Sequence, residues 1–198
     1  MFLHTGGADG SDHAFALIAS NNPDCRVLVH SFAGHRVNIN RMTEEQKSRV
    51  KVVIHSKDEL SEGFSYIDKA SKVLKRHLPM KEYVMNLLLR NYFQIKDSEY
   101  VFAVAPLQNN RMVKGGTGWA VEMAIQQKLP VVVFSDSPQT ESSWYYFSYK
   151  KQIFQKTHGN PPQGFLLNLK QQGIKNVTGI GTRELSEQGR EAIRMLFP

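Results

Sequence analysis

The chain has 198 residues, of which 41% are hydrophobic and 22% are charged. These values are near the globular average and exclude a disordered composition. No apolar run approaches the roughly 18 to 20 residues that span a bilayer, and the N-terminal residues lack the basic-then-apolar pattern of a secretory signal. The single cysteine, Cys25, excludes a disulfide within these residues. We therefore expect one cytoplasmic domain over 1–198, without a membrane partner.

The net charge of +7 favours anionic partners, either small phosphorylated ligands or nucleic acid. Histidines are present without the spacing of a zinc site, so no metal and no required cofactor are expected. The basic stretch from Lys69 to Lys81 is a candidate nucleic-acid surface, although at helical spacing it is more often one solvated helix face.

Apolar runs of strand length alternate with helical patterns along most of the chain. In the first half of the chain, the predicted elements are a strand over 1–5, a helix beginning near Asp12, a strand over 26–30, a connection or short helix over 41–48 and a strand over 50–55. A helix over 67–77 and a helix after Pro79 that reaches Ile95 come next. The second half has strands over 100–105 and 130–134 with a helix over 119–127 between them, then a strand over 177–181 and a helix from about Ser186.

Strands that alternate with helices predict an α/β fold, a doubly wound, mostly parallel Rossmann-like sheet. Ligands of such sheets bind beyond the carboxyl ends of the strands. The segment 136–164 interrupts the pattern with many aromatic residues and is interpreted as an irregular insertion. It is either a flap that seals the sheet edge, the favoured reading because aromatic residues usually pack, or a lid over the pocket.

The first turn, Gly6-Gly7-Ala8-Asp9-Gly10-Ser11-Asp12, follows the first predicted strand. Its glycines allow close approach of the backbone to a ligand, and Asp12 is placed to cap the next helix. Free N–H groups at a helix start bind phosphate or carboxylate. The alternative is an ordinary tight turn.

A second turn, Gly115-Gly116-Thr117-Gly118, joins a predicted buried strand to a helix that carries Glu122 in its second turn. Thr117 is a candidate phosphate ligand, and the Glu122 carboxylate is a candidate for a ribose hydroxyl or for chemistry at a sugar carbon. The alternative is that Glu122 satisfies amides near its own helix start.

This second turn, with a glutamate four residues after its last glycine, resembles the Lonely Guy, or lysine-decarboxylase-like, family of the SLOG superfamily, which also includes the DNA-processing protein Smf and molybdenum cofactor carrier proteins. Arg90-Asn91 resembles the arginine that precedes this motif in the family, and the first turn resembles the superfamily's nucleotide-binding turn. The resemblance implies a Rossmann-like fold, a nucleotide-type ligand, roles for Arg90 and Asn91 in the pocket, and a homodimer or other homo-oligomer.

Two features depart from the family pattern. Trp119 stands where the family has threonine, which removes a hydroxyl; its indole either stacks on a base or packs on the sheet. The turn Gly179-Ile180-Gly181-Thr182-Arg183 resembles one that follows the first strand in the family, yet it lies near residue 198. We hypothesise a circular permutation that places the 177–181 strand beside the 1–5 strand. Thr182 and Arg183 then join the pocket, and the alternative is a surface arginine.

Ser31 and His35 follow the second predicted strand, where His35 either faces the ligand or is a solvated loop residue. These candidates support first a carrier or sensor that binds a nucleotide or nucleotide-derived phosphorylated ligand. The alternative is an N-glycoside hydrolase that releases a base from a nucleoside phosphate, with Glu122 and Arg90 as catalytic residues. A DNA-binding protein resembling Smf ranks last, because no base-reading motif is present.

Overall fold

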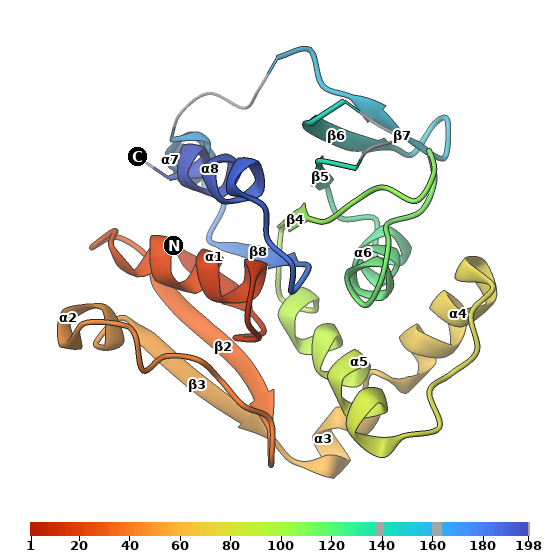
Figure 1. Cartoon of the computed structure of the whole chain (residues 1–198), viewed down its shortest axis with the longest axis horizontal. Coiled ribbons are helices and arrows are strands. Elements are labelled where there is room, and N and C mark those ends of the chain that lie inside the picture. The colour runs from red at the N-terminus through yellow and green to blue at the C-terminus, as the bar shows by residue number, and fades with distance from the viewer. Residues whose placement is uncertain (138–140, 160–163, 198) are drawn as a thin grey trace.

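The computed structural model describes residues 1–137, 141–159 and 164–197. Strands in this part of the chain form one sheet in the order β3-β2-β1-β8-β4-β5-β6-β7 (Figure 1). The strands are β1 (Phe2–Thr5), β2 (Arg26–Phe32), β3 (Val50–His55), β4 (Tyr100–Val104), β5 (Val131–Ser135), β6 (Ser143–Ser148), β7 (Ile153–Lys156) and β8 (Asn176–Gly181). The helices are α1 (Ser11–Ser20), α2 (Glu44–Lys47), α3 (Lys57–Ser61), α4 (Phe64–Leu74), α5 (Glu82–Ile95), α6 (Thr117–Gln126), α7 (Phe165–Gln171) and α8 (Glu187–Leu196).

Six neighbouring strands, from β3 through β5 in the sheet order, are parallel, and helices cover both faces of the sheet. The predicted α/β class with a mostly parallel Rossmann-like sheet is therefore confirmed. Helices α1 and α8 pack on one face, and α4, α5 and α6 pack on the other (Figure 1). Apolar residues of β4 alternate between the two cores, with Val101 and Ala103 in one and Phe102 in the other, which explains its nearly continuous apolar sequence.

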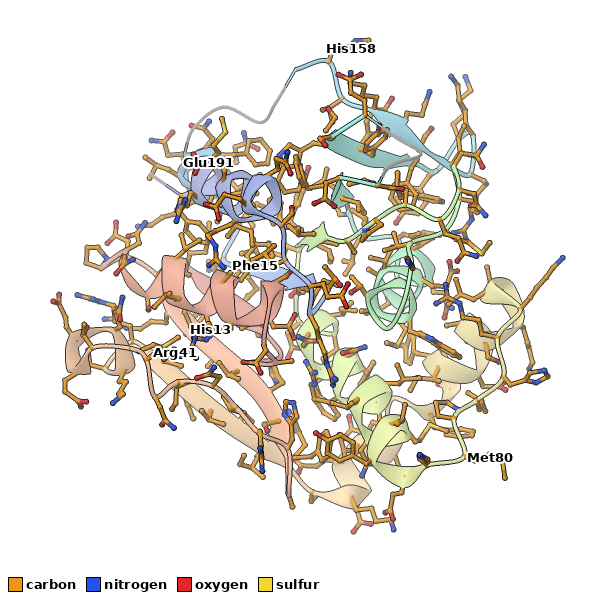
Figure 2. All side chains as sticks on the ribbon, in the orientation of Figure 1. His13, Phe15, Arg41, Met80, His158 and Glu191 are labelled. Atoms are coloured by element: carbon orange, nitrogen blue, oxygen red, sulfur yellow. The ribbon has the colours of Figure 1, made fainter. Side chains whose placement is uncertain are left out.

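Most apolar side chains lie in these two cores, although a few are exposed. Phe15 of α1 is completely buried and points into the core that α1 shares with the sheet (Figure 2). Met80, just before α5, is fully exposed and extends into solvent (Figure 2). No helix in the described ranges is long and apolar enough to cross a membrane.

Strand β8, the last in the chain, lies inside the sheet. It pairs in parallel with β1 on one side and with β4 on the other. The predicted position beside the first strand is therefore confirmed, while a circular permutation as its origin stays a prediction. Gly179 allows α1 to approach, because a Cβ atom there would lie 2.5 Å from the Phe15 ring.

The expectation of an irregular segment over 136–164 is wrong for the residues of β6 and β7. Strands β6 and β7 form an antiparallel hairpin, and β6 pairs with β5. Trp144 of β6 is 1% exposed and packs edge-on against Phe102 and Phe134. The hairpin thus covers the edge of β5, as expected from the favoured reading of this segment as a flap, and its described residues do not line the main cavity. Residues 138–140 and 160–163 of the segment lie outside the described residues.

Candidate functional site

A cavity of about 570 Å³ opens beyond the carboxyl ends of the central strands, within the range of small-molecule sites. Ala8 follows β1, Pro106 follows β4 and Thr182 follows β8, and all three line it. Helix α5 forms one wall, and the turn before α6 forms another. Of the residues selected from sequence, the cavity lining includes Ala8, Asp12, Arg90, Asn91, Gly115, Gly116, Thr117, Thr182 and Arg183.

The loops after β1 and β8 are joined to each other and to α5 through Asp12. One oxygen of Asp12 accepts a hydrogen bond from the Gly181 N–H at 3.1 Å, and the other pairs with Arg90 Nη1 at 3.4 Å. Ser11 N–H also donates to the Thr182 carbonyl at 2.9 Å. Asp12 therefore connects the two loops rather than serving as a simple helix cap.

Arg90 and Asp12 are both buried, with Arg90 only 4% exposed. Burial raises the pKa of the Asp12 carboxyl against the opposing effects of Arg90 and the Gly181 N–H. Burial also lowers the pKa of the Arg90 guanidinium. Their contact is longer than a strong charge-assisted hydrogen bond, and Arg90 Nε has no partner in the described part of the chain. Arg90 thus keeps hydrogen-bonding capacity.

Gly6 provides the space for this ion pair. A Cβ atom at Gly6 would lie 1.3 Å from Arg90 Nη1 and 2.4 Å from Asp12 Oδ2. Gly6, Gly7 and Gly10 do not line the cavity themselves. Gly10 instead packs against the backbone of Thr182 and Arg183. The glycines of the first turn therefore shape the wall of the cavity.

The turn before α6 is open to the cavity. Gly115 and Gly116 have no atom within 4 Å of an added Cβ, and Gly115 has φ of +69°, a conformation that favours glycine. Gly118, which does not line the cavity, packs so tightly that its added Cβ would lie 2.2 Å from the Val113 carbonyl oxygen. The turn thus pairs two accessible glycines with one that fixes the start of α6.

Two exposed cations lie at the cavity. Lys114 and Arg183 both line it, and neither forms an ion pair within the described ranges. Together with the free N–H groups expected at the start of α6, they favour a negatively charged ligand group.

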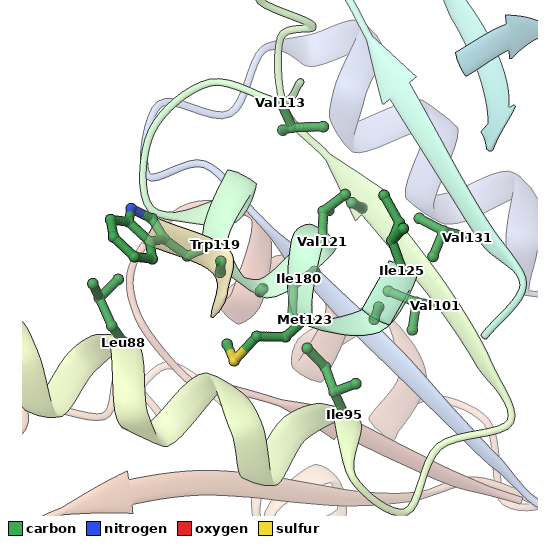
Figure 3. Close-up of a cluster of buried hydrophobic side chains, with 14 of the residues drawn as sticks. Leu88, Ile95, Val101, Val113, Trp119, Val121, Met123, Ile125, Val131 and Ile180 are labelled. Atoms are coloured by element: carbon green, nitrogen blue, oxygen red, sulfur yellow. The ribbon is translucent and has the colours of Figure 1, made fainter. Parts of the chain in front are cut away.

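Glu122 and Trp119 do not line the cavity. Residues of an α-helix are rotated by about 100° each, so both lie on the side of α6 away from Thr117. Glu122 is 3% exposed and its carboxylate pairs with Arg111 at 2.8 Å. Trp119 is buried beside Leu88 between α6 and α5 (Figure 3). The indole therefore packs on the core and not on the cavity.

Ser31 and His35 also lie outside the lining. Their side chains are hydrogen-bonded at 2.9 Å, and the His35 ring stacks on Phe32. Burial, with Arg90 and Arg183 nearby, lowers the pKa of His35 to about 4. His35 is thus a neutral residue near the two arginines at neutral pH.

Sequence reasoning missed several lining residues, four of which lie on one face of α5. These are Val84, Leu87, Leu88 and Gln94, together with Pro106, Lys114, Ala120, Ile180, Gly181 and Glu184. The sequence predicted this helix but assigned none of these four positions to the site. Gln94 follows Arg90 by one helical turn, which is the signal that would have placed both on one side.

Comparisons with protein-family models, with curated proteins and with solved structures found no match.

Proposed function

We propose that the cavity binds a nucleotide or a nucleotide-derived phosphorylated ligand, and that the protein is a carrier or sensor of that ligand. The observation that carries the proposal is the meeting of three turns at one cavity. The loops after β1 and β8 and the turn before α6 all line it, although they are far apart in the sequence.

The chemistry of the lining supports a ligand with an anionic and an apolar part. Lys114 and Arg183 supply unpaired positive charge within the described residues, and Gly115 and Gly116 leave backbone accessible. Leu87, Leu88 and other apolar side chains cover the α5 wall. A phosphate at the turn before α6, Gly115 to Gly118 and hereafter the glycine turn, and a sugar or base against α5 match this distribution. The resemblance to the SLOG superfamily points to the same ligand class.

The proposal is tested by substitution of Gly116, which has φ of −63° and open space around it. In Gly116→Val the fold tolerates the side chain, but its methyl groups occupy the position that a phosphate needs. We expect at least a 10-fold loss of affinity for nucleoside monophosphates by calorimetry, with little change in thermal unfolding without ligand. Gly116→Ala is the matched control and should lose less.

Equal binding by folded Gly116→Val and the unsubstituted protein would refute the assignment of the glycine turn. No binding of nucleoside mono-, di- or triphosphates to the unsubstituted protein would refute the proposed function itself.

The N-glycoside hydrolase alternative rests on Glu122, whose carboxylate is paired with Arg111 outside the cavity lining. The lining contains other carboxylates, Asp12 and Glu184. Release of free base from nucleoside monophosphates, lost in Glu122→Gln, would favour the hydrolase. Binding without release favours the carrier. Tight and steeply salt-dependent DNA binding would favour the third alternative.

A further inference from the structure

One face of helix α5 lines the cavity and changes in polarity along the helix; we call it the graded face. Val84, Leu87, Leu88, Asn91 and Gln94 recur at helical spacing and all line it. The first three are apolar and the last two carry amides. One wall therefore changes from apolar to hydrogen-bonding along the axis of the helix.

Gln94 lies at the polar end of this face and is 1% exposed. Within the described ranges, neither Oε1 nor Nε2 of its side-chain amide has a hydrogen-bond partner. A buried amide without partners costs free energy, so such a group in a cavity wall calls for a functional explanation.

The backbone holds Gln94 in place. Its carbonyl oxygen accepts hydrogen bonds from the hydroxyls of Ser98 and Thr178, and Thr178 lies in the central strand β8. The end of α5 is thereby fixed to the middle of the sheet. Because the backbone at Gln94 is fixed, its side-chain amide has little freedom to move. This favours binding of one kind of ligand group over adjustment to several kinds.

The glycine turn lies toward the other end of the graded face. Figure 3 shows Trp119, at the start of α6, beside Leu88, and Met123 farther along α6 beside Ile95. Leu88 and Gln94 are separated by about 9 Å along the helix axis. A ligand with its phosphate near the turn thus extends along α5 to reach Gln94.

We propose that Gln94 determines which nucleotide the cavity binds. Its side-chain amide would form hydrogen bonds with an edge of the nucleobase that has a donor beside an acceptor. An amide offers one acceptor and donors side by side, which matches the hydrogen-bonding edge of a nucleobase. The apolar side chains of Leu87, Leu88 and Ile180, which share the lining, suit the flat face of the ring. This inference rests on the proposed function and adds the recognised part of the ligand.

The test compares four nucleoside 5′-monophosphates, AMP, GMP, CMP and UMP, with ribose 5-phosphate, which has no base. Calorimetry of the unsubstituted protein should show at least one nucleotide binding more tightly than ribose 5-phosphate. Gln94→Met, similar in size but without the amide, should weaken that nucleotide at least 10-fold and leave ribose 5-phosphate within about 2-fold.

Gln126→Met is the matched control. Gln126 also carries a side-chain amide without partners in the described residues, but it does not line the cavity. This variant should bind the nucleotide and ribose 5-phosphate as the unsubstituted protein does. Thermal unfolding of both variants without ligand measures any common structural effect.

The inference is overturned if no nucleotide binds more tightly than ribose 5-phosphate, or if Gln94→Met weakens both ligands equally or neither. In each of these cases, binding of ribose 5-phosphate would leave the proposed phosphate site standing. Absence of binding by all five compounds, and by the corresponding nucleoside di- and triphosphates, would instead remove the proposed function together with this inference.

Discussion

At the scale of single residues, the cavity wall depends on a position where no side chain fits. Gly6 lies against the buried pair of Arg90 and Asp12, at distances that exclude a Cβ atom. In Gly6→Ala, either the backbone of the first turn moves or the ion pair separates. Separation leaves two buried charges without compensation.

We therefore expect Gly6→Ala to lower the free energy of unfolding by about 3 kcal/mol or more. Urea denaturation at neutral pH measures this change. Gly34→Ala is a control, because Gly34 also follows a strand but has no atom within 4 Å of an added Cβ, although its positive φ disfavours alanine. A loss in Gly6→Ala no larger than that in Gly34→Ala would contradict the expected collision.

A second residue-scale feature is a row of three buried histidines under α5. His30 lies between the other two, with ring nitrogens 3.0 Å from His4 and 2.9 Å from His55. Phe93 of α5 stacks on the His55 ring. Burial, with the neighbouring histidines, lowers the pKa of His30 to about 2.

This shift predicts a loss of stability in acid. A histidine of the unfolded chain titrates near 6.5, so the unfolded state binds more protons than the folded state below that pH. The contribution of His30 is complete above about pH 6.5 and declines toward lower pH by up to about 1.4 kcal/mol per pH unit. His30→Leu should show a flatter dependence of unfolding free energy between pH 6.5 and 4.5. Parallel curves for the two proteins would contradict the buried neutral histidine.

At the scale of secondary-structure elements, the glycine turn is supported by α4 through Arg76. This residue follows α4 and donates hydrogen bonds to the carbonyl oxygens of Gly115 at 2.8 Å and Val113 at 3.1 Å, and to the Gln108 side chain at 3.0 Å. A flat guanidinium satisfies three acceptors at once, which lysine cannot do with the same geometry. The arginine thus orders the turn that the proposed ligand contacts.

Arg76→Met should increase hydrogen–deuterium exchange in residues 113–118 and weaken nucleotide binding several-fold. Lys69→Met is the matched control, because it removes an exposed charge of α4 that does not contact the turn. Unchanged exchange of this segment in Arg76→Met would show that the turn is ordered without the arginine.

Elements of this chain were largely predictable because local patterns coincide with buried faces. The apolar runs of β4 and β5 and the spacing of α5 identified these elements. The β6–β7 hairpin was missed because its aromatic sequence was interpreted as an insertion, and α3 because its capping box at Ser56 and Glu59 was overlooked.

The site was predictable at its turns and not at its walls. Which turns follow strands is local information, so Gly115, Gly116 and Arg183 were identified as candidates. The direction of Glu122 depends on the exact start of α6, and its partner Arg111 comes from the preceding loop. The place of Gln94 in the cavity wall depends on the position of α5 over the sheet, which the sequence does not specify.

At the scale of the whole molecule, the middle of the sheet is completed by β8, a strand from late in the sequence. Strand β8 pairs with β1 and β4, and its Val177 and Thr178 are completely buried. The sheet is therefore continuous only when the region near residue 180 joins the first and middle parts of the chain. We expect amides of β8 to exchange as slowly as those of β4 and more slowly than those of the edge strand β3. Exchange of β8 at the rate of β3 would contradict this central role.

The central claim is that separated turns converge to hold one phosphate group. Its most direct measurement is a crystal structure of the protein with the most tightly bound of the four nucleoside monophosphates. We expect the phosphate within about 3 Å of the backbone N–H groups of the 115–117 turn, with Arg183 beside it and the base toward Gln94. A phosphate bound elsewhere on the protein, or these turns closed against each other without a ligand between them, would contradict the account.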